Sequence, residues 1–120
     1  MAVRKLARIK LTQEDIDEGR AMCYNTGLLK TDNCPVWQAL RYCFTEKVYA
    51  FEVGLWNILL HYDDDAAGLS KHKHISLPQN ARVFISDFDQ RHSVEPFEFE
   101  IDDRSVEEFF KPEYIEERRF

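Results

Sequence analysis

The five residues Phe97-Glu98-Phe99-Glu100-Ile101 alternate strictly between apolar and acidic side chains. Successive side chains of a β-strand point to opposite faces of the sheet, so this period of two predicts a strand with one buried face and one face in water. Sheets with one wet face are commonly antiparallel. The chain must therefore supply partner strands, and further apolar side chains to cover the Phe and Ile face.

Four other segments have the composition of strands. Residues 7–11 alternate apolar and basic side chains, and residues 74–77 form a short candidate. Residues 47–53 and 56–62 are rich in aromatic and β-branched side chains, with Gly54 at a bend between them. We expect these last two segments to pair as antiparallel strands.

Helical periodicity is clearest beside two prolines. Pro35 and Pro78 each stand at the start of a segment in which apolar residues recur three and four positions apart, the spacing of one helix face. The two stripes are Val36, Ala39, Leu40, Cys43 and Phe44, and Leu77, Ala81, Phe84, Ile85 and Phe88. Each stripe predicts a helix that packs one side against a core.

Shorter helices are expected towards both ends. Thr12, followed by acidic residues that include Asp15, has the pattern of a helix N-cap. Gly19 is expected to end that helix, which leaves residues 21–33 as a loop. The apolar residues of a small helix towards the other end are Val106, Phe109 and Phe110. The tail 112–120 is expected either to add a turn of helix or to fray.

These elements predict one α+β domain over residues 1–120, with a small antiparallel sheet packed by two or three helices on one face. The chain is 44% hydrophobic and 13% aromatic, enough bulky material for a core without metal or disulfides. No stretch is long and apolar enough to span a bilayer. The three cysteines include no C-x-x-C pair, which fits reduced thiols and a cytoplasmic location.

Residues spread over about half of the chain resemble a pattern of small bacterial and phage proteins. The matching residues are Thr12 with Ile16, Cys34-Pro35 with Ala39-Leu40, Leu77-Pro78, Phe84-Ile85, Phe88-Asp89, Val94, Pro96-Phe97 and Phe99. Those proteins often have Gly after the Phe-Asp pair, whereas this chain has Arg91-His92, so the turn departs from the pattern. The resemblance implies a shared fold and an origin in a mobile element, and it implies no activity.

The formal charge is −6, from 22 acidic and 16 basic side chains. This balance opposes direct binding to nucleic acid, whose affinity comes largely from Lys and Arg, and it suits docking onto a basic partner. The carboxylates expected to form the docking surface are Glu98, Glu100, Asp102, Asp103, Glu107 and Glu108. Ordinary solvation of these residues is the alternative.

We therefore predict a non-enzymatic acidic binding protein that docks onto a basic protein or nucleoprotein surface. Given the resemblance, a phage or mobile-element accessory or inhibitory factor is a concrete version of this hypothesis. No contact with a membrane is expected. Two alternatives remain open: a small metal- or cysteine-dependent enzyme, and a homodimer with a structural or regulatory role.

Cys34 is the candidate nucleophile of the enzyme alternative. It would stand at the first turn of a helix, where the helix dipole lowers the pKa of a thiol. A catalytic cysteine also needs a nearby base, and only tertiary structure could bring a histidine to it. We favour a structural role for Cys34, either as a helix cap or as a buried residue.

His72 and His74 are the first candidate metal ligands, because residues two apart on a strand point the same way. A third ligand would come from His61 or from Asp63 and Asp65, in an acidic run that is otherwise expected to be a solvated turn. That run lacks the ligand pattern of an EF-hand, and histidines next to acidic loops are commonly only solvated. We therefore expect no bound metal or cofactor.

Overall fold

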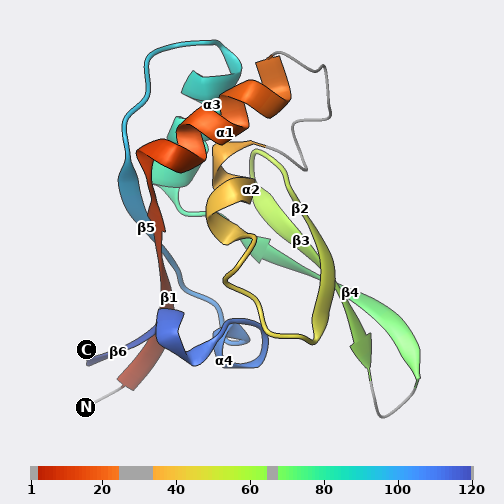
Figure 1. Ribbon diagram of the computed structural model, residues 1–120. Helices are drawn as coiled ribbons and strands as arrows, with labels where there is room; N and C mark the ends of the chain where they lie inside the picture. Colours follow the sequence, from red (N-terminus) through yellow and green to blue (C-terminus); the bar gives the residue numbers. More distant parts are fainter. Residues whose placement is uncertain (1–2, 25–33, 65–67, 120) are drawn as a thin grey trace.

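The computed structural model describes residues 3–24, 34–64 and 68–119. It confirms the α+β class, but the strands form two three-stranded antiparallel sheets rather than one, in the orders β5-β1-β6 and β2-β3-β4 (Figure 1). The elements are β1 (Val3–Leu11), α1 (Gln13–Tyr24), α2 (Pro35–Leu40), β2 (Val48–Val53), β3 (Asn57–Asp64), β4 (Leu69–Ser76), α3 (Gln79–Asp89), β5 (Phe97–Ile101), α4 (Val106–Phe109), the 3-10 helix η2 (Pro112–Tyr114) and β6 (Ile115–Arg119).

The sheet β5-β1-β6 is built around the first strand of the chain. The alternating segment is β5, and its residues Phe97 and Ile101 pair with Leu11 and Ala7 of β1. As predicted, Phe99 and Ile101 are buried. The opposite face carries charged side chains that include Arg8, Lys10, Glu98 and Glu100.

The tail 112–120 is predicted only in part: Pro112–Tyr114 form a turn of 3-10 helix, but the residues that follow do not match the prediction. Residues Ile115–Arg119 neither continue a helix nor fray, but form β6 and pair with the first part of β1, so that Val3 lies opposite Arg119. The two ends of the chain therefore lie side by side (Figure 1). Pairing satisfies the backbone hydrogen bonds along one edge of β1, a long-range effect that the mixed charges of the tail do not reveal.

The sheet β2-β3-β4 contains the two strands predicted on either side of Gly54, and they pair as expected. Two boundaries differ from the prediction. Asp63 and Asp64 belong to β3 rather than to a turn, because they continue its pairing with Ser70 and Leu69 of β4. For the same reason β4 is longer than the candidate 74–77. The third acid of the run, Asp65, lies outside the described residues.

Helix α1 begins as predicted. The hydroxyl of Thr12 accepts a hydrogen bond from the Asp15 amide at 3.3 Å, and the Asp15 carboxylate accepts one from the Thr12 amide at 2.9 Å. Such a reciprocal pair satisfies amides that the first turn of a helix leaves without partners. The expected end at Gly19 is wrong, since the helix continues to Tyr24. The remainder of the predicted loop, residues 25–33, lies outside the described residues.

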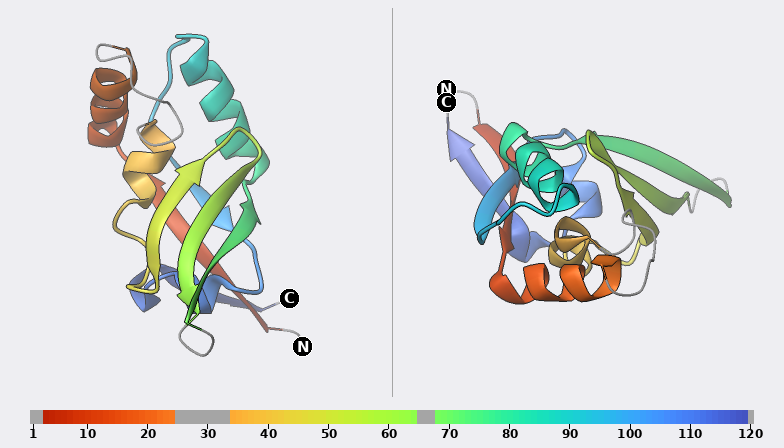
Figure 2. Two further views of the ribbon diagram at one scale, coloured as in Figure 1. Left: turned by 90° about the vertical axis from the view of Figure 1, so that its right-hand side faces the viewer. Right: turned by 90° about the horizontal axis from the view of Figure 1, so that it is seen from above.

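Both predicted apolar stripes face the core. Every residue of the α3 stripe is buried, from Leu77 before the helix to Phe88 in its last turn. Helix α2 ends at Leu40, earlier than its stripe suggests, yet Cys43 and Phe44 beyond it remain buried. Viewed from above, α2 lies between α1 and α3 (Figure 2).

One cluster of buried apolar side chains draws on the inner faces of both sheets and on the helices. Aromatic rings bind its parts together: Trp37 of α2 stacks on Phe51 of β2, with ring centroids 5.1 Å apart. Phe44 contacts Phe51 and also Phe110, which follows α4. Aromatic pairs of this kind stabilise a fold beyond the apolar area they bury.

Candidate functional site

The six carboxylates expected to form an acidic docking surface all have a cation within 4 Å. Glu100 is the most heavily engaged, because it accepts hydrogen bonds from Arg118 of β6 at 2.8 Å and from Arg8 of β1 at 3.1 Å. Its neighbour Glu98 lies 3.8 Å from both Arg8 and Lys10. The strand register explains these pairs, since Arg8 and Lys10 lie directly opposite Glu100 and Glu98.

The other four carboxylates are paired by different elements. Asp102 binds Arg4 at 2.7 Å, and Glu107 lies 3.2 Å from Lys5. Glu108 forms an ion pair with Lys47, and Asp103 lies 3.8 Å from Lys73. The six carboxylates are thus interleaved with cations and do not form a field of one sign.

Hydrogen bonds shift the pKa values of Glu100 and Asp103. The hydrogen bond from Arg118 lowers the pKa of Glu100 below its ordinary value and outweighs the loss of hydration. Partial burial would raise the pKa of Asp103, but the hydroxyl and amide of Ser105 donate hydrogen bonds to its carboxylate, and the net shift is downward. Both groups are therefore stabilised as carboxylates.

A different set of carboxylates has no such partner. Glu14, Asp17 and Glu18 are exposed on α1, and within residues 3–24, 34–64 and 68–119 no cation forms a recorded ion pair with any of them. Asp17 accepts a hydrogen bond from Gln13. Because residues three and four apart share one side of a helix, these three lie on a common face, which we call the α1 acidic face. In the sequence, the acids of this segment indicated only the start of a helix.

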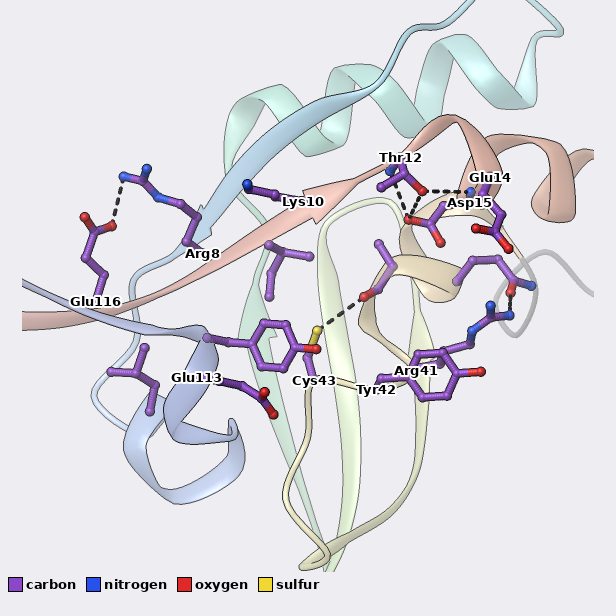
Figure 3. Close-up of a pocket in the computed structure, with 15 residues that line it drawn as sticks. Arg8, Lys10, Thr12, Glu14, Asp15, Arg41, Tyr42, Cys43, Glu113 and Glu116 are labelled. Atoms are coloured by element: carbon purple, nitrogen blue, oxygen red, sulfur yellow. Dashed lines mark hydrogen bonds and ion pairs between the residues drawn. The ribbon is translucent and has the colours of Figure 1, made fainter.

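A cleft of about 680 Å³ opens beside the first turn of α1 (Figure 3). β1 contributes Arg8 and Lys10 to its lining, α1 contributes Glu14 and Asp15, and Glu113 and Tyr114 come from η2. Tyr42, which follows α2, is exposed and has the guanidinium of Arg41 over its ring at 4.8 Å. The cleft combines cations, carboxylates and two tyrosines, and the α1 acidic face begins at its edge with Glu14.

Cys43 lines the cleft but has no reactive thiolate. Its Sγ donates a hydrogen bond to the Ala39 carbonyl at 3.2 Å (Figure 3). Burial raises the pKa of Cys43 to about 12, even though a hydrogen bond with Tyr114 acts in the opposite direction. At neutral pH the residue is a thiol, the weak form of the nucleophile.

Cys34 caps α2, the structural role favoured from the sequence. Its Sγ accepts a hydrogen bond from the Trp37 amide at 3.4 Å, and only 3% of the residue is exposed. Burial raises the pKa of Cys34 to about 12, which outweighs the hydrogen bond from the helix amide. The described histidines lie on β3, on β4 and after α3. Among the hydrogen bonds of the described residues, none joins Cys34 to a histidine that could act as its base.

Three of the four histidines come together on the second sheet. His72 and His74 lie on the outer face of β4, and His61 of β3 is the cross-strand partner of His72. Asp63 pairs with Ser70 farther along the same strands, while Asp64 binds Lys71 at 2.6 Å. Among the described residues, no three His, Cys, Asp or Glu side chains already surround one point where an ion could sit.

Comparisons of the chain with protein-family models, with curated proteins and with solved structures each returned no match. In the part of the chain that the structure describes, no helix has both the length and the apolar character needed to cross a membrane.

Proposed function

We propose that this protein is a binding protein that docks onto a basic macromolecular surface through the α1 acidic face and the adjoining cleft. The observation that carries the proposal is the uneven use of acidic residues. The carboxylates of β5 and α4 are neutralised within the molecule, whereas Glu14, Asp17 and Glu18 remain available to cations from outside.

Charge pairing decides which acids can contribute to binding. An external Lys or Arg that approached Glu100 would have to displace Arg8 and Arg118, and little net energy would be gained. An exposed carboxylate without an internal partner offers its full attraction and speeds the encounter with a basic partner. The α1 acidic face therefore replaces the sheet carboxylates as the proposed contact surface.

The cleft supplies the second part of the proposed contact. Glu14 and Glu113 lie on two of its sides, and the rings of Tyr42 and Tyr114 line it. Carboxylates together with aromatic rings suit the side chain of an arginine, which pairs with the former and stacks on the latter. An arginine-rich surface, such as a nucleic-acid-binding protein exposes, is the partner chemistry that fits. A mobile-element factor that covers such a surface is one concrete case.

An oligo-arginine peptide is the probe for this function. We expect it to bind at low salt, as measured by calorimetry, and to perturb the NMR signals of α1 and of the cleft. Combining Glu14→Gln, Asp17→Asn and Glu18→Gln should weaken binding by about tenfold, the equivalent of about 1.4 kcal/mol over three exposed charges. The helix should lose little stability, because these side chains are exposed and an acid such as Glu14 in the first turn contributes only about 0.3–1 kcal/mol.

The matched control changes the net charge equally at another place. A variant with Glu98→Gln, Glu107→Gln and Glu108→Gln also loses three negative charges, but these residues already pair with Lys10, Lys5 and Lys47. We expect the control to bind oligo-arginine almost as the unaltered protein does. Equal weakening in both variants, or tighter binding to duplex DNA than to oligo-arginine, would refute the proposed surface.

A further inference from the structure

The open face of the sheet β2-β3-β4 carries a row of three imidazoles. The ring centroids of His61 and His72 are 6.4 Å apart, and those of His72 and His74 are 6.2 Å apart. In the left view of Figure 2 this sheet lies nearest the viewer, with no helix or strand drawn in front of it. His72 and His74 are exposed and His61 is half-buried, so the row is accessible from solution.

Strand alternation explains why the imidazoles share one face. Leu60 of β3 and Ile75 of β4, which neighbour the row, are completely buried and point to the core. Lys71 and Lys73 also point away from the row, since they pair with Asp64 at 2.6 Å and with Asp103 at 3.8 Å. The lysine between His72 and His74 consequently does not place its charge among the imidazoles.

Two oxygen-bearing side chains of β2 stand beside the row. The carboxylate of Glu52 lies 3.1 Å from Nε2 of His61, within hydrogen-bond distance. The ring of Tyr49 lies 6.3 Å from that of His61, and its hydroxyl hydrogen-bonds to Ser70. A carboxylate that holds one ring nitrogen of a histidine orients the other nitrogen, as second-shell groups do at metal sites.

From this arrangement we propose that His61, His72 and His74 bind a divalent transition-metal ion of the zinc type, with Glu52 orienting His61. Three imidazoles with an open position form a common ligand set of zinc. Zinc–nitrogen distances of about 2.0–2.1 Å place the ring centroids of two bound imidazoles roughly 5–6 Å apart, slightly closer than the His61–His72 and His72–His74 pairs are here. Among the described residues no ring contact joins His61 and His74, so binding requires side-chain rotations that bring both of these rings to one ion beside His72.

Imidazole also determines which ions compete. Neutral ring nitrogens favour zinc, copper and nickel over calcium and magnesium, which prefer oxygen ligands. Because a proton and the ion compete for the same nitrogens, the affinity should fall as the solution is acidified. The remaining coordination positions of the ion face solvent.

Titration with Zn²⁺ tests this site. We expect calorimetry at neutral pH to show one ion per chain, with at least a tenfold loss of affinity in each of His61→Gln, His72→Gln and His74→Gln. Long-range proton–nitrogen NMR spectra should show the shift of a coordinated nitrogen on these three rings. Glu52→Gln should weaken binding less, and His61 should show a changed tautomer balance.

The fourth histidine is the control. His92 follows α3 and lies 3.5 Å from Asp87, away from the row, so His92→Gln should bind Zn²⁺ like the unaltered protein. Absence of Zn²⁺ binding would overturn the proposal. So would a site that survives His61→Gln, since His72 and His74 would then bind the ion without β3. Because oligo-arginine binding is measured on α1, failure of either proposal leaves the other intact.

Discussion

Cys34 and Cys43 illustrate at the scale of one residue how burial overrides a local signal. A helix amide points at the sulfur of Cys34 and favours its thiolate, but the loss of hydration has the larger effect on the pKa. In Cys43 a tyrosine hydroxyl acts in the same direction and is likewise outweighed. Both sulfurs serve the fold, as a cap in one case and as a hydrogen-bond donor in the other.

We expect iodoacetamide to label Cys34 and Cys43 at pH 7.5 on the order of a hundredfold more slowly in the folded protein than in urea, because neither thiol is ionised or accessible. Peptide mass spectrometry after timed quenching would assign the rate to each cysteine. Rapid and selective labelling of Cys34 in the folded protein would instead support the cysteine-dependent enzyme.

At the scale of elements, Gly19 of α1 lies at the contact with Pro35, the first residue of α2. A Cβ built on Gly19 would lie 2.6 Å from both the nitrogen and the Cδ of Pro35, closer than real atoms approach. Glycine is present because the two helices cross closely, and it does not interrupt α1. The sequence predicts a helix end at Gly19, because a glycine that ends a helix and a glycine at a close contact between helices have the same sequence signal.

Gly19→Ala should therefore destabilise the protein. An alanine in an ordinary helix position is favoured over glycine by about 1 kcal/mol, but forcing Pro35 away should cost about 2–3 kcal/mol, the upper part of the range for overpacking, and we expect a net loss of about 1–2 kcal/mol. Urea unfolding followed by circular dichroism would measure this loss of stability. In the same helix the exposed control Ala21→Gly should lose about 1 kcal/mol from propensity alone. A gain in stability for Gly19→Ala would show that the helices do not meet as described.

At the scale of the whole molecule, the acidic residues that the structure describes are divided unevenly between those paired with cations and those without a cation nearby. A net charge of −6 is compatible with acids spread evenly over the surface or gathered at one place. The structure places the cations of β1 and β6 against the acids of β5, so these acidic side chains form ion pairs within the molecule. What remains exposed on α1 is available for binding.

The same interactions predict how stability depends on pH. The pKa values of Glu100 and Asp103 are lowered in the folded state, so their stabilisation is present above the unfolded values of about 4 and is lost as the pH falls below them. The pKa values of Cys34 and Cys43 are raised to about 12, so the folded state keeps protons that the unfolded chain releases from about pH 9 upwards. The free energy of unfolding should therefore decrease both at acidic pH and at alkaline pH.

Urea unfolding at a series of pH values would give the free energy of unfolding as a function of pH, with an acid limb and an alkaline limb to test. Glu100→Gln should flatten the acid limb between about pH 3 and 5, because the variant has no carboxylate to protonate there. Cys43→Ala should flatten the alkaline limb above about pH 9, in addition to a uniform loss from the cavity it leaves. If either variant kept the full slope of its limb, the assignment of that limb to its group would be wrong.

Much of the secondary structure could be predicted from the sequence because its signals are local. The alternation of β5, the stripes of α2 and α3, and the cap at Thr12 each lie within a few consecutive residues. Apolar periodicity reports which side of an element is buried, and that information does not depend on what the element packs against. The α+β class followed from these segments alone.

Contacts between distant segments were decided only by the tertiary structure. β6 exists because β1 offers it an edge, the sheet carboxylates are paired because of the register of β5 on β1, and His61 meets His72 through the register of β3 on β4. A strand pattern indicates that a residue faces water, but not which residue of another strand lies opposite. Both proposed sites depend on such placement. The register of β3 on β4 brings the histidines together, and the position of α1 leaves its carboxylates without nearby cations among the described residues, neither of which can be read from the sequence.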